Sequence, residues 1–141
     1  MTVISRSEAA HTDGAFRIRL KTSSSFTSGD LLAIYPANDY RERTYSIGKV
    51  DKEIQLSVKL HPSGFGSGYL YNLQPGDTIQ ARIVANYDFR FPTFVPKVIM
   101  IANGTGIAPS PGMIDQNKRK PKRTCIAVSG VHPLLRCTKK K

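Results

Sequence analysis

Two short segments of this chain carry residue types that could bind a phosphate and a flat ring. The first is Arg43-Thr44-Tyr45-Ser46. An arginine fork suits a phosphate or pyrophosphate because it donates two parallel hydrogen bonds. In a strand, Tyr45 points to the same side as Arg43, so its ring could cover a planar ligand, while Ser46 offers a donor to a ring nitrogen. Taken alone, the segment is more typical of a surface strand with a cross-strand aromatic pair.

The second segment, Gly64-Phe65-Gly66-Ser67-Gly68-Tyr69-Leu70, is rich in glycine. Glycines let the backbone approach an anion, and a helix that follows them offers free N–H groups to a phosphate. By itself the pattern is more often a flexible hairpin loop.

A third segment, Gly104-Thr105-Gly106-Ile107-Ala108-Pro109, directly follows the apolar run 97–102. A Gly-x-Gly turn between a strand and a helix can bring the helix N-terminus up to a dinucleotide pyrophosphate. The segment lacks the complete six-residue dinucleotide fingerprint, so the strand before it carries much of the signal.

The elements that must position these segments are mainly short strands. Alternation of apolar and polar residues, bounded by turn residues, predicts strands that argue for a small antiparallel barrel or sandwich. These strands are expected near residues 3–4 and at 16–20, 31–35, 44–50, 54–60 and 78–84. One or two turns of helix are expected at 69–73.

The pattern changes after Phe91-Pro92. The continuous apolar strand at 97–102 is typical of a parallel sheet covered on both faces, and a helix is expected over 109–116. The sequence therefore predicts a β domain over residues 1–96, the start of a nucleotide-binding α/β domain over 97–117, and a basic tail over 118–141.

Taken together and in this order, the three segments resemble the ferredoxin-NADP-reductase superfamily, most closely its cytochrome P450 reductase and sulfite reductase flavoprotein branch. The resemblance covers roughly residues 1–117. It implies a six-stranded antiparallel Greek-key barrel that binds flavin, followed by a nicotinamide domain. The implied cofactor is FAD, with FMN as the alternative, and NAD(P)H is the implied hydride donor.

The resemblance also implies roles for individual residues. Arg43 would hold a flavin phosphate, Tyr45 would stack on the ring and Ser46 would lie near N5, which makes Tyr45 and Ser46 the catalytic candidates. The implied phosphate contacts come from Gly64, Gly66 and Ser67, and the nicotinamide nucleotide would face Gly104, Thr105 and Gly106. The implied partner is a redox acceptor of haem, iron-sulfur or flavodoxin type.

The C-terminal part departs from the family pattern. Ser110-Pro111 stands where the family commonly has an aromatic or apolar residue, and the chain after Gly106 is too short for a complete nicotinamide domain. We therefore expect a C-terminally truncated enzyme that binds flavin weakly and is not reduced by NADPH at a useful rate, with sheet residues such as Val98, Met100 and Ile101 poorly covered. A shift of reading frame between Asn117 and Thr124 is one hypothesis for the tail, and a natural basic tail is the other.

The remaining composition narrows the choice of function. Ten of the 21 Lys and Arg residues lie in residues 97–141, which hold only one of the ten Asp and Glu residues. The excess positive charge therefore belongs to the C-terminal part, and we do not expect residues 1–96 to bind nucleic acid. We expect no membrane span, no secretory signal, a cytoplasmic location and no metal site. No catalytic pattern matches the two cysteines, Cys125 and Cys137, or the three histidines, His11, His61 and His132. Asp88 and Arg90 are expected where the two domains meet.

The sequence is compatible with three functions: a flavin-dependent oxidoreductase, a flavin-binding remnant without turnover, and a basic protein whose tail binds nucleic acid or an anionic surface.

Overall fold

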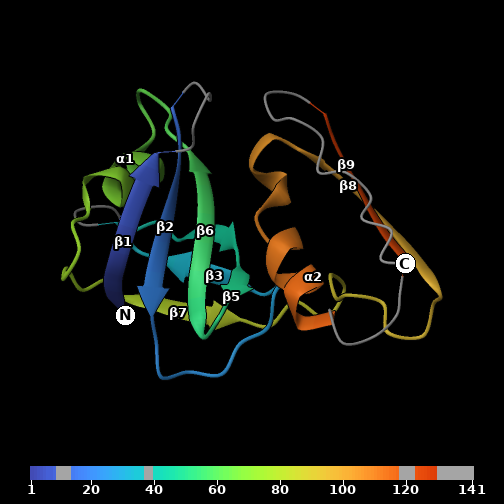
Figure 1. Ribbon diagram of the computed structural model, residues 1–141. Helices are drawn as coiled ribbons and strands as arrows, with labels where there is room; N and C mark the ends of the chain where they lie inside the picture. Colours follow the sequence, from blue (N-terminus) through green and yellow to red (C-terminus); the bar gives the residue numbers. More distant parts are fainter. Residues whose placement is uncertain (9–13, 37–39, 118–122, 130–141) are drawn as a thin grey trace.

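The computed structural model describes residues 1–8, 14–36, 40–117 and 123–129. The expectations about His11, His132 and Cys137, and about most of the basic tail, lie outside these residues. Strand is the main secondary structure of the described chain, and seven of its nine strands lie in antiparallel sheets, which confirms the predicted mainly β fold class (Figure 1).

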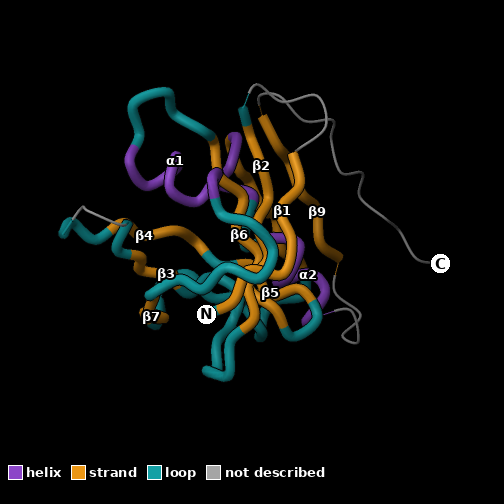
Figure 2. Tube along the Cα trace, turned by 90° about the vertical axis from the view of Figure 1, so that its left-hand side faces the viewer, coloured by secondary structure: helices purple, strands orange, loops and turns teal. Residues whose placement is uncertain are grey.

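Two antiparallel sheets make up the body of the protein. The four-stranded sheet has the order β1 (Thr2–Glu8), β2 (Ala15–Lys21), β6 (Glu53–Lys59), β5 (Gly48–Val50). The three-stranded sheet has the order β4 (Arg43–Ser46), β3 (Leu31–Ile34), β7 (Ala81–Val84). Figure 2 shows β3, β4 and β7 turned away from the direction of β1 and β6.

The two sheets are joined where the chain passes from one to the other. The strand expected over 44–50 is divided at Ile47, which lies between β4 and β5. The Ile47 N–H donates to the Asp30 carbonyl at 2.8 Å, and its carbonyl accepts from Gly29 N–H at 2.9 Å. On the other side, a bridge between Thr2 and Thr78 links β1 to the segment before β7.

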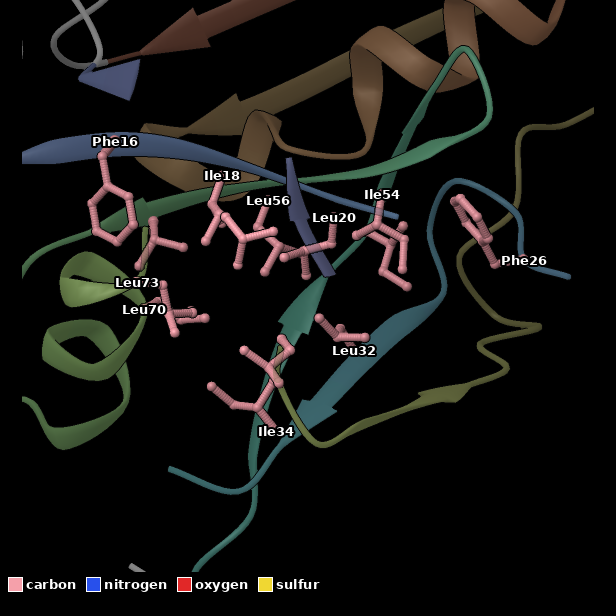
Figure 3. Close-up of a cluster of buried hydrophobic side chains, with 14 residues drawn as sticks. Phe16, Ile18, Leu20, Phe26, Leu32, Ile34, Ile54, Leu56, Leu70 and Leu73 are labelled. Atoms are coloured by element: carbon pink, nitrogen blue, oxygen red, sulfur yellow. The ribbon is translucent and has the colours of Figure 1, made fainter. Parts of the chain in front are cut away.

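The core fills the space between the sheets. Because β2 and β6 alternate, Ile18 and Leu56 point inward and are fully buried, while Arg17 and Ser57 point outward. Helix α1 (Phe65–Asn72) closes one end of this space, and Figure 3 shows Leu70 from α1 pointing toward the side chains of the strands. The helix begins at Phe65, four residues earlier than expected, so the glycine-rich segment is its first turn rather than a loop.

The C-terminal part packs on the four-stranded sheet. Strand β8 (Lys97–Asn103) is followed by the 3₁₀ turn η1 (Gly104–Ile107), by helix α2 (Ser110–Asn117), which contacts β5, and by β9 (Arg123–Ser129). In Figure 1, α2 lies between the body and the β8–β9 pair. Strand β9 pairs with β8 in parallel, so the described chain holds a β-α-β unit that includes a strand not expected from the sequence.

Exposure along β8 differs from expectation at Val98 and agrees with it at Ile101. Val98 is buried and Met100 is half-buried, whereas Ile99 and Ile101 are exposed at 72% and 81%. One face of β8 is therefore uncovered among the described residues. No helix in the described part of the chain is long and apolar enough to cross a bilayer.

Candidate flavin site

A cavity of about 420 Å³ opens where the two sheets diverge, beside the first turn of α1. It is lined by Arg43, Tyr45, Ser57, Val58, Lys59, His61, Ser63, Gly64, Phe65, Gly66, Ser67 and Thr105. All three segments singled out in the sequence thus contribute to one cavity, although they are separated by up to about sixty residues of chain.

Arg43 and Tyr45 share one face of β4, as the alternation of a strand requires. Both side chains approach Gly66 closely. A Cβ placed on Gly66 would lie 2.6 Å from the Tyr45 hydroxyl and 3.0 Å from Arg43 Cγ. Gly66 therefore has no side chain because the arginine and tyrosine occupy that space, and the three residues form one wall of the cavity.

The Tyr45 phenol is neutral at ordinary pH. Burial raises the pKa of this phenol above its usual range, and the neighbouring Arg43 guanidinium lowers it in part. Tyr45 thus presents a flat, uncharged ring with a hydroxyl that can donate a hydrogen bond, next to a permanent positive charge.

The first turn of α1 supplies unpaired backbone donors. Its first helical hydrogen bond runs from Gly68 N–H to the Gly64 carbonyl at 2.8 Å, and no side chain caps the helix. The N–H groups of the three residues before Gly68 have no partner within the helix and are available to an anion.

Ser67 stabilises this turn rather than leaving its hydroxyl free. Its Oγ accepts from His61 N–H at 3.1 Å and donates to the Gly64 carbonyl at 3.3 Å. Since the side chain is engaged and buried, the backbone N–H of Ser67 is the donor that remains for a ligand.

The other residues that the sequence predicts for the site are Ser46, Gly104, Thr105 and Gly106. Thr105 of η1 lines the cavity, but Gly104 and Gly106 do not, and Ser46 is exposed on the face of β4 opposite Tyr45. Sequence reasoning missed Ser57, Lys59 and Phe65 as lining residues.

The missed residues carry a signal in the sequence. Ser57 and Lys59 are the outward positions of a strand whose inward positions are apolar, and this strand leads directly into the glycine-rich segment. His61 is exposed, as expected for a loop histidine, yet it also lines the cavity.

Asp30 fixes the segment around residues 86–90 to the body. This buried carboxylate accepts hydrogen bonds from the Thr27 N–H at 2.8 Å and the Asn86 N–H at 3.0 Å and pairs with the Arg90 guanidinium. Burial raises the pKa of Asp30, but these bonds and the Arg90 charge outweigh it, so the pKa lies below its usual range. Arg90 thus contacts the body through Asp30, while Asp88 is exposed, and their place at a domain junction stays a prediction.

We expect Asp30→Asn to destabilise the protein by about 1–3 kcal/mol at neutral pH because the ion pair and the charged acceptor are lost. A carboxyl with a lowered folded pKa stabilises the protein above its unfolded pKa, and this stabilisation is lost as pH falls through the folded pKa. The difference between the two proteins in urea unfolding should therefore shrink below about pH 4. Asp88→Asn is the control, expected within about 0.5 kcal/mol of the wild type. A difference that stays constant down to pH 2 would contradict this assignment.

The proteins that this chain resembles include reductases and a flavohemoglobin. No family model matches the chain. The chain is 30% identical over 134 residues to terephthalate 1,2-dioxygenase reductase component 1 of Comamonas, a match that covers 91% of this chain and 40% of that protein. The chain therefore spans less than half the length of this curated relative.

Solved structures share the fold at lower identity. A single-residue mutant of ferredoxin-NADP+ reductase of Plasmodium falciparum, solved with 2'P-AMP, superposes with a TM-score of 0.74 at 20% identity over 90% of this chain and 60% of its own. A cytochrome P450 reductase of Amycolatopsis gives a TM-score of 0.74 at 23% identity over 90% and 41%. A flavohemoglobin of Malassezia yamatoensis, solved with FAD and haem, gives 0.68 at 10% identity over 90% and 36%.

Proposed function

We propose that this chain, which has the ferredoxin-NADP-reductase-like fold, binds FAD in the cavity between β4, β6 and α1 and acts as the flavin part of an NAD(P)H-dependent oxidoreductase. The observation that carries the proposal is the convergence of Arg43, Tyr45 and the first turn of α1 on one cavity. The relatives named above support the same class of reaction.

The residues present fit a flavin. Gly66 lets Arg43 and Tyr45 lie directly against the first turn of α1. The Arg43 guanidinium and the N–H groups of that turn suit a pyrophosphate, and the Tyr45 ring suits a planar face. A flavin bound here would supply the chemistry of accepting a hydride and passing on electrons.

The chain's own residues would bind and orient. Arg43 and the backbone N–H groups at Gly66 and Ser67 hold the phosphate end, with Gly64 giving the chain its turn into the helix. Tyr45 covers the ring. Ser46 follows it on the strand with its side chain on the opposite face of β4, so its contact with the ring would come from its backbone. Gly104, Thr105 and Gly106 face the nicotinamide nucleotide, Thr105 from within the cavity.

A partner that accepts electrons completes the proposed reaction. We place a haem, iron-sulfur or flavodoxin-type protein or domain in this role, because the Comamonas relative is the reductase component of a dioxygenase and the Amycolatopsis relative is a P450 reductase.

A flavin-binding protein without turnover is the second candidate. The exposed Ile99 and Ile101 favour it, because the sheet of a working dinucleotide domain is normally covered on both faces.

The experiment is to purify the chain, add FAD or FMN, and record the absorption spectrum of the protein after gel filtration. Because we expect weak binding, the flavin band should remain with the protein at less than one flavin per chain, and extraction should identify the flavin as FAD. Anaerobic bleaching by NADPH or NADH would support the oxidoreductase, and bound flavin that does not bleach would support the second candidate. Protein that retains no flavin at all would contradict both and leave the basic-protein alternative.

A further inference from the structure

The geometry points to Phe65 as the residue that covers the adenine ring of FAD and thereby makes this cavity prefer FAD to FMN. This inference rests on the proposed flavin site and adds a specificity-determining residue to it. FMN ends at its single phosphate, whereas FAD continues through a pyrophosphate to adenosine. A residue that contacts only adenine therefore distinguishes the two cofactors.

Phe65 is the first residue of α1 and lies at the rim of the cavity. Its side chain lines the cavity, yet it is 74% exposed. The helix is anchored through other positions, since Gly66, Ser67 and Leu70 are its buried residues. The phenyl ring of Phe65 thus contributes little to the core, and its apolar surface is open to a ligand.

The rings of Phe65 and Tyr45 border different parts of the cavity. The Tyr45 hydroxyl lies against Gly66, where a Cβ would approach it to 2.6 Å. Successive side chains of a helix are rotated by about 100° about its axis, so Phe65 points away from the side of α1 on which Tyr45 lies. Within the described part of the chain, the Phe65 ring stacks on no other ring and no cation. The cavity thus offers a ligand two separate aromatic surfaces.

The phosphate-binding turn of the proposed site lies between these two surfaces. The helical hydrogen bonds begin at Gly68, and the first N–H of the turn before it belongs to Phe65 itself. A ligand with its flavin ring on Tyr45 and its phosphates at this turn would place its next group beside the Phe65 ring. In FAD this group is adenosine, and FMN has no such group.

An adenine base suits an exposed phenylalanine ring. The base is flat and uncharged, and its stacking on an aromatic side chain needs only the two ring faces and no hydrogen bond. At the rim of the cavity, the polar edge of the base stays in contact with water. Because the pyrophosphate already holds the adenosine near the ring, little further freedom is lost when the two rings stack.

The test is to measure the affinities of FMN and FAD for the wild type and Phe65→Ala by flavin fluorescence titration. We expect FAD to bind about 5- to 20-fold more weakly to the variant, because base stacking is lost, and FMN to bind unchanged. Phe65→Tyr keeps an aromatic ring and should keep the FAD affinity. Phe94→Ala removes a fully exposed phenylalanine that does not line the cavity, and it should change neither affinity.

ADP separates this inference from the proposed function, because it carries adenine and a pyrophosphate without a flavin ring. In calorimetric titration, ADP should bind more weakly to Phe65→Ala than to the wild type, while inorganic pyrophosphate binds both equally. The same result in a protein that binds neither flavin would support the contact with adenine and contradict the flavin site.

Adenine is also part of NAD(P)H, and competition distinguishes the two sources. ADP should displace FAD from the wild type. ADP that leaves bound FAD in place would assign the Phe65 contact to the nicotinamide nucleotide and overturn the inference. Equal losses of FMN and FAD affinity in Phe65→Ala, or an unchanged FAD affinity, would overturn it as well.

Discussion

Replacing Gly66 by alanine is expected to weaken FAD binding by about 10- to 100-fold. The added Cβ would lie 2.6 Å from the Tyr45 hydroxyl and 3.0 Å from Arg43 Cγ, so it displaces both groups that form the wall of the cavity. Overpacking of this kind costs about 1–3 kcal/mol. The Tyr45 phenol is the far end of a side chain and can move away, so the cost should appear mainly in ligand binding and little in stability.

Gly68 provides the matched control, since it lies in the same helix two residues further on. A Cβ there meets nothing within 4 Å. Gly68→Ala should leave FAD affinity unchanged and should raise the stability of the helix slightly, because alanine favours helix over glycine. Equal FAD affinities for the two variants, measured by fluorescence titration beside thermal unfolding, would show that the ligand does not contact the Arg43–Tyr45–Gly66 wall.

The sequence predicts those features of the site that depend only on residues close together in the chain. Residues two apart in a strand share a face, so Arg43 and Tyr45 could be placed together without knowing the fold. Their closeness to Gly66 could be inferred only through the family resemblance, because about twenty residues separate them along the chain.

The contributions of Lys59 and Thr105 to the same cavity depend on how distant elements pack. Lys59 becomes part of the site because β6 ends beside α1, and Thr105 because η1 lies against β6. Alternation alone reveals neither contact. At Lys59 it indicates an ordinary solvent-facing position, and the only sequence signal there is that the strand leads directly into the glycine-rich segment.

The boundaries of the strands and helices, like the site, depend partly on local sequence and partly on contacts between segments far apart in the chain. The strand expected over 44–50 divides at Ile47 because this residue bonds to Gly29 and Asp30, a pairing that alternation alone cannot reveal. The start of α1 was missed because the glycines in its first turn have low helix propensity, while packing of Leu70 and Leu73 into the core holds the helix in place.

Helix α2 packs closely on the body at two glycines, just as Arg43 and Tyr45 pack closely on Gly66 in the wall of the cavity. Gly48 of β5 approaches the Ala108 carbonyl, and Gly112 of α2 approaches Ser28 and Lys49, so closely that a Cβ on either would overlap these atoms. Ser28 is itself fixed, since its Oγ accepts from Lys49 N–H at 2.8 Å. This close approach holds α2 and the η1 turn before it, and thereby Thr105, against the body.

Gly112→Ala is therefore expected to cause a large loss of stability for the addition of a single methyl group. The Cβ would lie 2.5 Å from the Lys49 carbonyl oxygen and 2.6 Å from its nitrogen, and it would overlap the buried Ser28 Oγ. Backbone atoms of a paired strand cannot move aside as a side chain can, so α2 must shift as a body. We expect a net loss of about 1–3 kcal/mol, even though alanine has the better helix propensity. The midpoint of thermal unfolding should fall by about 3–10 °C.

Gly106→Ala tests whether this loss comes from the contact with the body or from glycine replacement near the junction in general. A Cβ on Gly106 meets nothing within 4 Å, so its unfolding midpoint should stay within about 2 °C of the wild type. If α2 packs as described, Gly112→Ala should also increase hydrogen exchange in α2 and in the turn that carries Thr105, while β1 and β2 keep their protection. Unchanged exchange in α2 together with an unchanged unfolding midpoint would mean that α2 does not rest on β5 in solution.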